Sequence, residues 1–243
     1  MDERKLLLEG SKLLGIDLSE GQIEQLMNYK KLLLEWNEKI NLTAITDDME
    51  IITKHFLDCL TVSKALDMNR VNTLIDIGTG AGFPGLVIKI AFPHIQITLV
   101  DSLKKRLVFL EEVIKVLNLK QIECIHSRAE DLGKEKKYRE KYDVCASRAV
   151  ANLAVLSEYT LPFVKIGGYL IALKGQKLDE EIEQGKRALN ILGGEIEQIV
   201  DATIPTTEFN HRIAKIKKVK QTSLKYPRKA GEPTKFPLGM NKL

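Results

Sequence analysis

The sequence predicts an α/β protein with a seven-stranded, mostly parallel sheet, helices on both faces of the sheet, and an N-terminal helical extension. Three observations support this class. Residues 1–70 carry apolar side chains at helical spacing, without a strand signal. From Val71 onward, short apolar runs alternate with helical segments, which is typical of strand–helix–strand units. The first of these runs is followed by glycines at alternate positions, Gly78, Gly80 and Gly82, as at the carboxyl end of a ligand-binding parallel strand.

The N-terminal extension, residues 1–70, should contain three helices. Ser19, with Gln22 three residues later, forms a capping-box signal at the start of the second helix. The third helix is expected from about Asp48 to Met68. Its buried face would carry Ile51, Ile52, Phe56, Leu57, Leu60 and Leu66, which recur at helical spacing.

The sheet should begin directly after this extension. Strands are expected at residues 73–77, 96–100, 122–126, 144–147 and 169–173, with helices between them. Pro84 suits the first turn of the first of these helices, because proline lacks an N–H and an N–H in the first turn has no partner within the helix. Later helices are expected at 103–117 and 178–192. Two more strand-like runs, 196–200 and 213–219, predict a hairpin at the sheet edge. The core domain is therefore placed at 71–220, and a basic, proline-rich tail at 221–243.

Composition excludes several classes of protein. The 243 residues are 44% hydrophobic and 29% charged, which is ordinary for a globular chain. No apolar run approaches the ~18 residues of a membrane-spanning helix, and the N-terminus lacks the apolar stretch of a signal peptide. Cys59, Cys124 and Cys145 are odd in number and follow no metal-type spacing. We therefore expect reduced thiols, no metal, no membrane association and a cytoplasmic location.

The net charge of +4 is unevenly distributed along the chain. Residues 211–243 hold ten Lys or Arg and one acidic residue, Glu232, so this segment carries +9 and the remaining body −5. A basic block of this kind favours a phosphate-rich partner, because each cation near a phosphate releases a condensed counterion. The alternative is a solvated strand with a solvated chain end.

The loop after the first strand is the strongest functional signal. Asp76 closes an apolar strand, and Gly78 and Gly80 let the backbone approach a ligand closely before a helix begins. The simplest alternative is a tight turn, but four glycines between residues 78 and 85 exceed what a turn needs. Residues 80–85 also match the dinucleotide pattern G-x-G-x-x-G. Asp76 would repel a pyrophosphate there, whereas the cationic methionine end of S-adenosylmethionine would be attracted.

Polar residues at the ends of the following strands complete this predicted site. Asp101 ends the second strand and could accept both ribose hydroxyls of a nucleoside ligand, or could instead cap the helix that follows. The loop after the third strand, residues 127–131, would lie against adenine and use Glu130 or Asp131. Arg148 ends the fourth strand, where it could reach the rim of the site or form an ion pair with Glu130.

The chain is similar over essentially its full length to the bacterial 16S ribosomal RNA guanine-N7 methyltransferases, the glucose-inhibited division protein B or RsmG family. The resemblance includes one departure, Cys59, where serine is expected. It is carried by Trp36–Asn37, Asn41–Ile45, His55–Asp58, Asp76–Gly85, Ser127–Asp131, Ser147–Val150, Lys174–Gly175 and Tyr226–Leu238.

The resemblance implies a class I, Rossmann-like fold and an S-adenosylmethionine-dependent enzyme. The implied reaction is methylation of guanine N7 at position 527, in the 530 loop of 16S rRNA. The substrate would be the small ribosomal subunit or an assembly intermediate. The family's cofactor-binding positions map to Gly78, Phe83, Ala129, Glu130 and Arg148.

The acceptor chemistry explains why the sequence shows no catalytic triad. Guanine N7 has a free lone pair, so it can attack the methyl group directly and needs no general base; alignment is then the main contribution to catalysis. His55 and Asp58 could be mistaken for acid–base groups, but a structural or RNA-contacting role fits them better.

RNA contacts are expected from four cations, and stacking on a base is expected from one of two aromatic residues. The cations are Lys174, Arg228, Lys229 and Lys235, and the aromatic residues are Tyr226 and Phe236. Pro227, Pro233 and Pro237 should keep the tail extended. Two other functions stay open at this point. One is a nicotinamide-dinucleotide oxidoreductase, and the other is a catalytically silent RNA-binding module.

Overall fold

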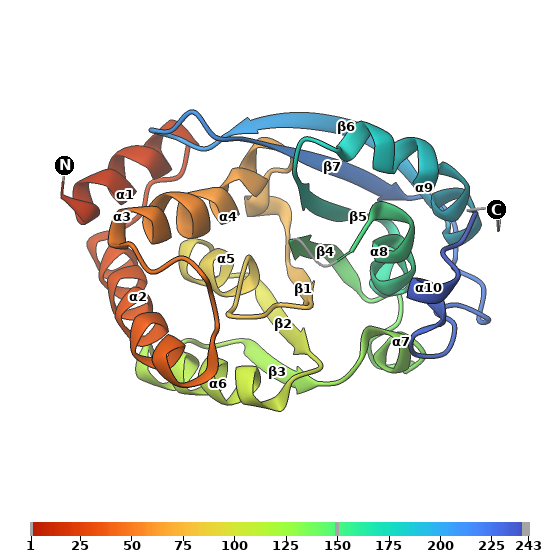
Figure 1. Cartoon of the computed structure of the whole chain (residues 1–243), viewed down its shortest axis with the longest axis horizontal. Helices are drawn as coiled ribbons and strands as arrows, with labels where there is room; N and C mark the ends of the chain where they lie inside the picture. The colour runs from red at the N-terminus through yellow and green to blue at the C-terminus, as the bar shows by residue number, and fades with distance from the viewer. Residues whose placement is uncertain (1, 149–150, 240–243) are drawn as a thin grey trace.

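A computed structural model describes residues 2–148 and 151–239, and it confirms the expected fold class. Two residues of the Ser147–Val150 motif, Ala149 and Val150, lie outside the described residues. The sheet has seven strands in the order β3-β2-β1-β4-β5-β7-β6 (Figure 1). The strands are β1 (Thr73–Ile77), β2 (Gln96–Asp101), β3 (Ile122–His126), β4 (Tyr142–Arg148), β5 (Val164–Lys174), β6 (Gly194–Thr203) and β7 (Asn210–Lys218).

The topology brings the predicted site residues to one edge of the sheet. Strands β1 to β5 pair in parallel, and β7 pairs antiparallel with both β5 and β6, so the expected edge hairpin is present. The strand order reverses between β1 and β4, and such a switch point leaves a crevice beyond the carboxyl ends of parallel strands. Asp76, Asp101 and Arg148 all lie near those ends.

Helices cover both faces of the sheet (Figure 1). Because successive strand residues point to opposite faces, Leu74 packs into one apolar cluster and Ile75 into another. The first cluster includes side chains of α5 (Gly85–Ala91) and α6 (Lys104–Val116). The second includes side chains of α7 (Ala129–Leu132), α8 (Leu153–Thr160) and α9 (Leu178–Leu192).

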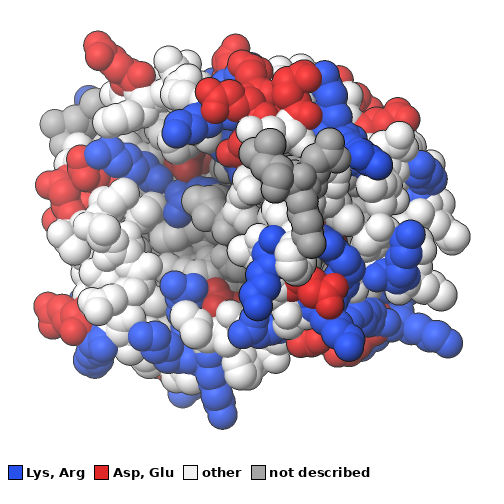
Figure 2. All heavy atoms as spheres, turned by 45° about the vertical axis from the view of Figure 1, so that its right-hand side comes forward, with Lys and Arg blue, Asp and Glu red and all other residues white. Residues whose placement is uncertain are grey.

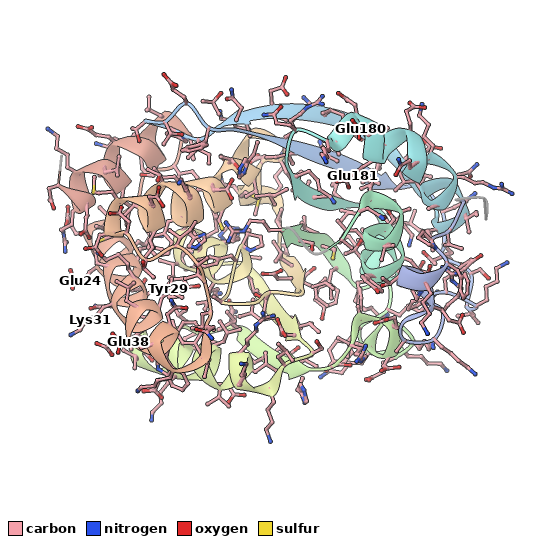
Figure 3. The ribbon with its side chains drawn as sticks, viewed as in Figure 1. Glu24, Tyr29, Lys31, Glu38, Glu180 and Glu181 are labelled. Carbon is pink, nitrogen blue, oxygen red and sulfur yellow. The ribbon has the colours of Figure 1, made fainter. Side chains whose placement is uncertain are left out.

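The N-terminal helices α1 (Glu3–Leu13) and α2 (Glu20–Ile40) join the first cluster. The predicted capping box is present: Ser19 Oγ accepts from the Gln22 amide at 3.3 Å, and the Ser19 amide donates to Gln22 Oε1 at 2.8 Å. Tyr29 points inward from α2, whereas Glu24, Lys31 and Glu38 lie on its outer side (Figure 3). This face-by-face difference is what the helical periodicity predicts.

The third helix differs from the prediction of one α-helix over 48–68. A continuous helical segment is divided into α3 (Asp48–Ile51), a π-helical turn (Ile52–Leu57), α4 (Asp58–Leu60) and a 3₁₀ turn (Thr61–Lys64). A π turn holds more residues than an α turn, so apolar spacing alone cannot reveal it. Pro84 is also one residue earlier than expected, because it is the N-cap of α5 rather than part of its first turn.

The C-terminal segment is packed against the core. The Arg139 guanidinium donates to the carbonyls of Gly133, Thr222 and Tyr226 at 2.7 to 2.9 Å. The expectation of a tail without helix is wrong, because α10 (Glu232–Lys235) forms one turn with Pro233 in a position that tolerates proline. The division of the chain at residues 70 and 220 stays a prediction. In the described ranges, no helix has the length and apolar character needed to cross a membrane.

Candidate functional site

A cavity of about 380 Å³ opens at the carboxyl ends of β1 to β4, where the sequence places the ligand. We call it the first cavity. Its wall combines backbone from the glycine loop with side chains that follow β2, β3 and β4. It is lined by Ile77, Gly78, Val100, Asp101, Ser102, Arg106, Ser127, Arg128, Ala129, Glu130, Arg148 and Tyr159.

Gly78 of the glycine loop lines this cavity, and three glycines of the loop, Gly78, Gly80 and Gly82, have a positive φ, which favours glycine. Gly78 has φ +73°, and its amide donates to the Val100 carbonyl at 2.9 Å, which fixes the loop against β2. Gly82 has φ +100°, and a Cβ there would lie 2.7 Å from both Leu86 Cδ1 and the Tyr29 hydroxyl oxygen. The loop is therefore shaped from one side by β2 and from the other by α2.

Asp76 supports this loop from behind and does not line the first cavity. Its Oδ2 accepts hydrogen bonds from Thr79 Oγ1 at 2.7 Å and from the Gly85 amide at 2.8 Å. Burial raises the pKa of this carboxyl to about 6, and Oδ1 has no hydrogen-bond partner among the described residues. Oδ2 therefore closes the turn between β1 and α5, and the assignment of Asp76 to the cofactor stays a prediction.

Asp101 lies in the cavity wall and also stabilises the loop. Its Oδ2 accepts from the Gly80 amide at 2.9 Å and its Oδ1 from the Leu103 amide at 2.8 Å. The Arg106 guanidinium pairs with Oδ2 at 3.2 Å. Asp101 does not cap α6, because the N-cap is Leu103 and no side chain caps it; the Asp101 carboxylate instead holds the residues on either side of the cavity wall. Its contact with a ligand stays a prediction.

Ala129 and Glu130 begin α7 and close the opposite side of the first cavity. Glu130 is buried, and its Oε1 accepts a hydrogen bond from the Gly231 amide at 3.1 Å. Tyr159 of α8 lines the same cavity and forms a hydrogen bond with Thr234 at 2.9 Å. The C-terminal segment is thereby fastened to the cavity wall at two points.

Arg148 separates the first cavity from a neighbouring one. Its Nη1 pairs with Asp58 Oδ2 at 3.0 Å and donates to the Lys54 carbonyl at 3.1 Å. The expected ion pair with Glu130 is therefore wrong: Asp58 is the partner, because the helical segment after α3 brings its carboxylate to the end of β4. The guanidinium also lies 4.8 Å from the centre of the Phe83 ring, a cation–π distance.

Phe83 belongs to an aromatic cluster and does not line the first cavity. Its ring stacks on His55 at 4.4 Å between ring centres and lies 5.7 Å from the ring centre of Tyr29. The side chain is buried. Its ring contacts the Arg148 guanidinium, and the assignment of Phe83 to the cofactor stays a prediction.

The second cavity, of about 570 Å³, lies on the other side of Arg148. Asp58 is fully buried, and its Oδ1 accepts from His211 Nδ1 at 2.6 Å while Oδ2 holds Arg148. Burial lowers the pKa of His55 to about 4, whereas the hydrogen bond to Asp58 raises the pKa of His211. The lining residues are Lys54, His55, Asp58, Arg148, Ala151, Asn152, Leu173, Lys174, Gly175, Glu181 and His211.

Sequence reasoning missed this second cavity and its histidine. His211 lies at the start of β7, 153 residues from Asp58, and no spacing motif connects them. The one available signal was a polar residue at the start of a strand-like run, and such residues are common at strand ends.

The four predicted RNA-contacting cations divide into two pairs. Lys174 is buried and pairs with Glu181 at 2.6 Å; Glu181 extends from α9 and also accepts from the Leu153 amide (Figure 3). Arg228 pairs with the buried Glu158 at 2.7 Å. Lys229 and Lys235 are exposed.

The aromatic candidates divide in the same way. Tyr226 is buried, whereas Phe236 is 51% exposed. Figure 2 shows basic side chains gathered on the lower part of the face that carries the C-terminal segment, and acidic side chains gathered over α9. Exposed basic residues of this region and of the adjacent α7 include Arg128, Lys134, Lys225, Lys229 and Lys235.

Comparison with known proteins identifies the family. The family model for rRNA small subunit methyltransferase G matches residues 22–210 of this chain. The chain belongs to the rRNA small subunit methyltransferase G family. It is 50% identical to the ribosomal RNA small subunit methyltransferase G of Alkaliphilus oremlandii, over 98% of this chain and 100% of that protein. It is 52% identical to the one from Acetivibrio thermocellus, over 97% and 96% of the two chains.

Solved structures that resemble this methyltransferase support its fold alone. StiE O-MT residues 961–1257 match with a TM-score of 0.53 and 12% identity, over 69% of this chain and 75% of that one. The fibrillarin pre-rRNA processing protein of Methanococcus jannaschii matches with a TM-score of 0.50 and 18% identity, over 64% and 70%.

Family membership establishes an S-adenosylmethionine-dependent rRNA methyltransferase, with S-adenosylmethionine as its cofactor. The dinucleotide alternative is thereby set aside. The first cavity fits this cofactor in two respects: Asp101 and the buried Glu130 give it polar and acidic walls, and Gly78 leaves backbone exposed for close approach.

Proposed function

We propose that this enzyme transfers the methyl group of S-adenosylmethionine to N7 of the guanine at position 527, in the 530 loop of 16S rRNA. The RNA would be presented within the small subunit or an assembly intermediate, in the cytoplasm. The observation that carries the proposal is the pair of cavities that share Arg148 as a wall. In a doubly wound sheet such neighbouring sites lie beyond the carboxyl ends of the strands, where two reactants can meet.

The first cavity is assigned to the cofactor, which supplies a methyl group on a cationic sulfur. Gly78 and Gly80 offer backbone at close range, and Asp101 offers carboxylate oxygens to the ribose. Ala129 and Glu130 would hold the adenine. Asp76 and Phe83 act indirectly in this assignment, because Asp76 fixes the loop and Phe83 supports Arg148.

The second cavity is assigned to the target base. Guanine N7 attacks with a lone pair that is already free, so no group of the protein has to remove a proton. The lining agrees with this: both Asp58 oxygens are occupied by Arg148 and His211. His55 is a weak base, because its pKa is lowered to about 4, and its Nε2 is already paired with Thr43 Oγ1 at 2.8 Å. Rate enhancement would come from holding two reactants in line across the Arg148 wall.

RNA outside the target base would contact the exposed cations, with Lys229 and Lys235 as the candidates from the C-terminal segment. Arg228 and Lys174 are assigned to the fold instead, because each is held by an acidic partner. Phe236 is a candidate for stacking on a base, since its ring is half exposed.

The decisive experiment is methyl transfer from labelled S-adenosylmethionine to ribosomal particles from a strain that lacks this enzyme. The modified position is then mapped by chemical cleavage at N7-methylguanine. We expect one labelled guanine, at position 527 in the 530 loop. Label at another atom or another RNA position would refute the proposed site, and no label from a cofactor-binding enzyme would refute the proposed substrate.

A further inference from the structure

His211 occupies a position in the second cavity that the proposed chemistry does not yet use. Its side chain is about one-third exposed and lines the cavity. Nδ1 is fixed by Asp58 Oδ1 at 2.6 Å, so the ring is held by a carboxylate that cannot turn away, because its other oxygen holds Arg148. Nε2, on the opposite side of the ring, makes no hydrogen bond to any residue that the structure describes.

Guanine and adenine differ in the group that lies beside the reacting N7. On the edge that carries N7, guanine has the acceptor O6, whereas adenine has the donor N6–H₂ at the same place. A donor at this position would therefore select guanine and reject adenine. N7 itself must stay without a hydrogen bond so that its lone pair can attack.

We propose that His211 is the residue that selects guanine, donating a hydrogen bond from Nε2 to O6 of the base in the second cavity, with Asp58 as its positioning residue. This inference rests on the proposed function, because it assigns a role within the same cavity.

The surroundings of His211 favour the donor form of Nε2. With Nδ1–H directed at Asp58, Nε2 carries a hydrogen when the ring is protonated, and the Asp58 carboxylate favours that state. The other charged groups of the cavity are Lys54, Arg148, Lys174 and Glu181. Lys54 pairs with Glu50 and Lys174 with Glu181, while Arg148 opposes a second positive charge. Partial burial also opposes protonation, but the Asp58 contact outweighs both effects, since the pKa of His211 is raised overall.

The test compares base analogues in reconstituted small-subunit particles whose 16S RNA carries guanine, 2-aminopurine or inosine at the target position. 2-Aminopurine lacks O6 but keeps N7, whereas inosine keeps O6 and lacks the 2-amino group. The enzymes are the wild type, His211→Ala, His211→Gln and a control, His94→Ala. His94 is exposed in the turn before β2, and that turn lies at the amino ends of the strands.

We expect the wild type to methylate guanine roughly ten- to a hundredfold faster than 2-aminopurine, the range for a hydrogen bond to a charged group. In His211→Ala the ratio of the guanine rate to the 2-aminopurine rate should fall to the value set by the reactivity of the two bases alone. The ratio of the guanine rate to the inosine rate should be the same in His211→Ala as in the wild type. His211→Gln, which keeps a neutral donor at similar reach, should recover part of the ratio. His94→Ala should behave as the wild type.

Three results would overturn the inference in distinguishable ways. If His211→Ala lowers the methylation rate by the same factor on guanine and on 2-aminopurine, His211 has a structural role and does not recognise O6. An unchanged rate on guanine would show that His211 makes no contact with the base. If the wild type transfers no methyl to the guanine particles, the proposed function itself fails and this inference fails with it; binding of S-adenosylmethionine by each variant confirms that its fold is intact.

Discussion

Replacing Arg228 by alanine tests whether this cation belongs to the fold or to the RNA interface. Its guanidinium donates two hydrogen bonds to Glu158, from Nη2 to Oε2 at 2.7 Å and from Nε to Oε1 at 2.9 Å. Nη2 also donates to the Phe236 carbonyl at 2.8 Å. Glu158 is fully buried in α8. The substitution would leave a buried carboxylate without a cation and would loosen the C-terminal segment from α8.

The expected loss of folding stability in Arg228→Ala depends on how deeply Arg228 and Glu158 are buried. Breaking a buried ion pair by removing one side costs about 3–5 kcal/mol. We expect the lower end, about 3 kcal/mol, since the Arg228 side chain is 21% exposed and its backbone amide still donates to Glu158 Oε1. For a chain of this size that corresponds to roughly 6–12 °C in Tm.

The assay is urea unfolding followed by circular dichroism, with a thermal melt of the same samples. Lys229→Ala is the matched control, because the neighbouring lysine is exposed and should leave the unfolding midpoint unchanged. In a Glu158→Gln background, Arg228→Ala should cost about 2 kcal/mol less, since no buried charge is then left unpaired. Equal midpoints for Arg228→Ala and Lys229→Ala, together with weaker RNA binding by Arg228→Ala, would refute the reasoning and return Arg228 to the RNA interface.

Three further predictions concern the two cavities and the RNA surface. Gly78→Asp should lower the affinity for S-adenosylmethionine by roughly 100-fold or more, because its side chain fills the first cavity at φ +73° and adds negative charge; equal titration curves would contradict this. Lys229→Ala should weaken RNA binding and reduce the slope of log K against log salt by about 0.7 to 0.9, and an unchanged slope would remove Lys229 from the interface. Methyl transfer should decline as pH rises through the pKa of His211, which lies above its usual 6.5; this decline should be absent in His211→Ala, and an identical profile in both enzymes would exclude His211 as the titrating donor.

The local sequence patterns were sufficient for most of the framework. Short apolar runs located the five parallel strands and the edge hairpin, and Ser19 with Gln22 located the start of α2. Glycine spacing located the loop that lines the first cavity. These predictions agree with the structure because each depends on residues within a few positions of one another, where backbone geometry fixes which side chains share a face.

Local patterns failed where helical geometry changed without a compositional signal. The segment after Ile51 keeps its apolar side chains but includes a π turn, which differs from the predicted α-helix. The prediction of an Arg148–Glu130 ion pair failed because it considered only the loops at the ends of neighbouring strands. The partner of Arg148 is Asp58, which comes from the N-terminal extension.

The sequence by itself determined the fold class, the family and the position of the glycine loop around Gly78. Tertiary structure alone decided that Asp58, Arg148 and His211 meet at one wall between two cavities. These three residues come from a helical extension, the end of a parallel strand and the start of an antiparallel strand. Their contact depends on strand order and on the packing of the extension over the sheet, and both are set by burial of apolar surface across the whole chain. No spacing along the sequence encodes it.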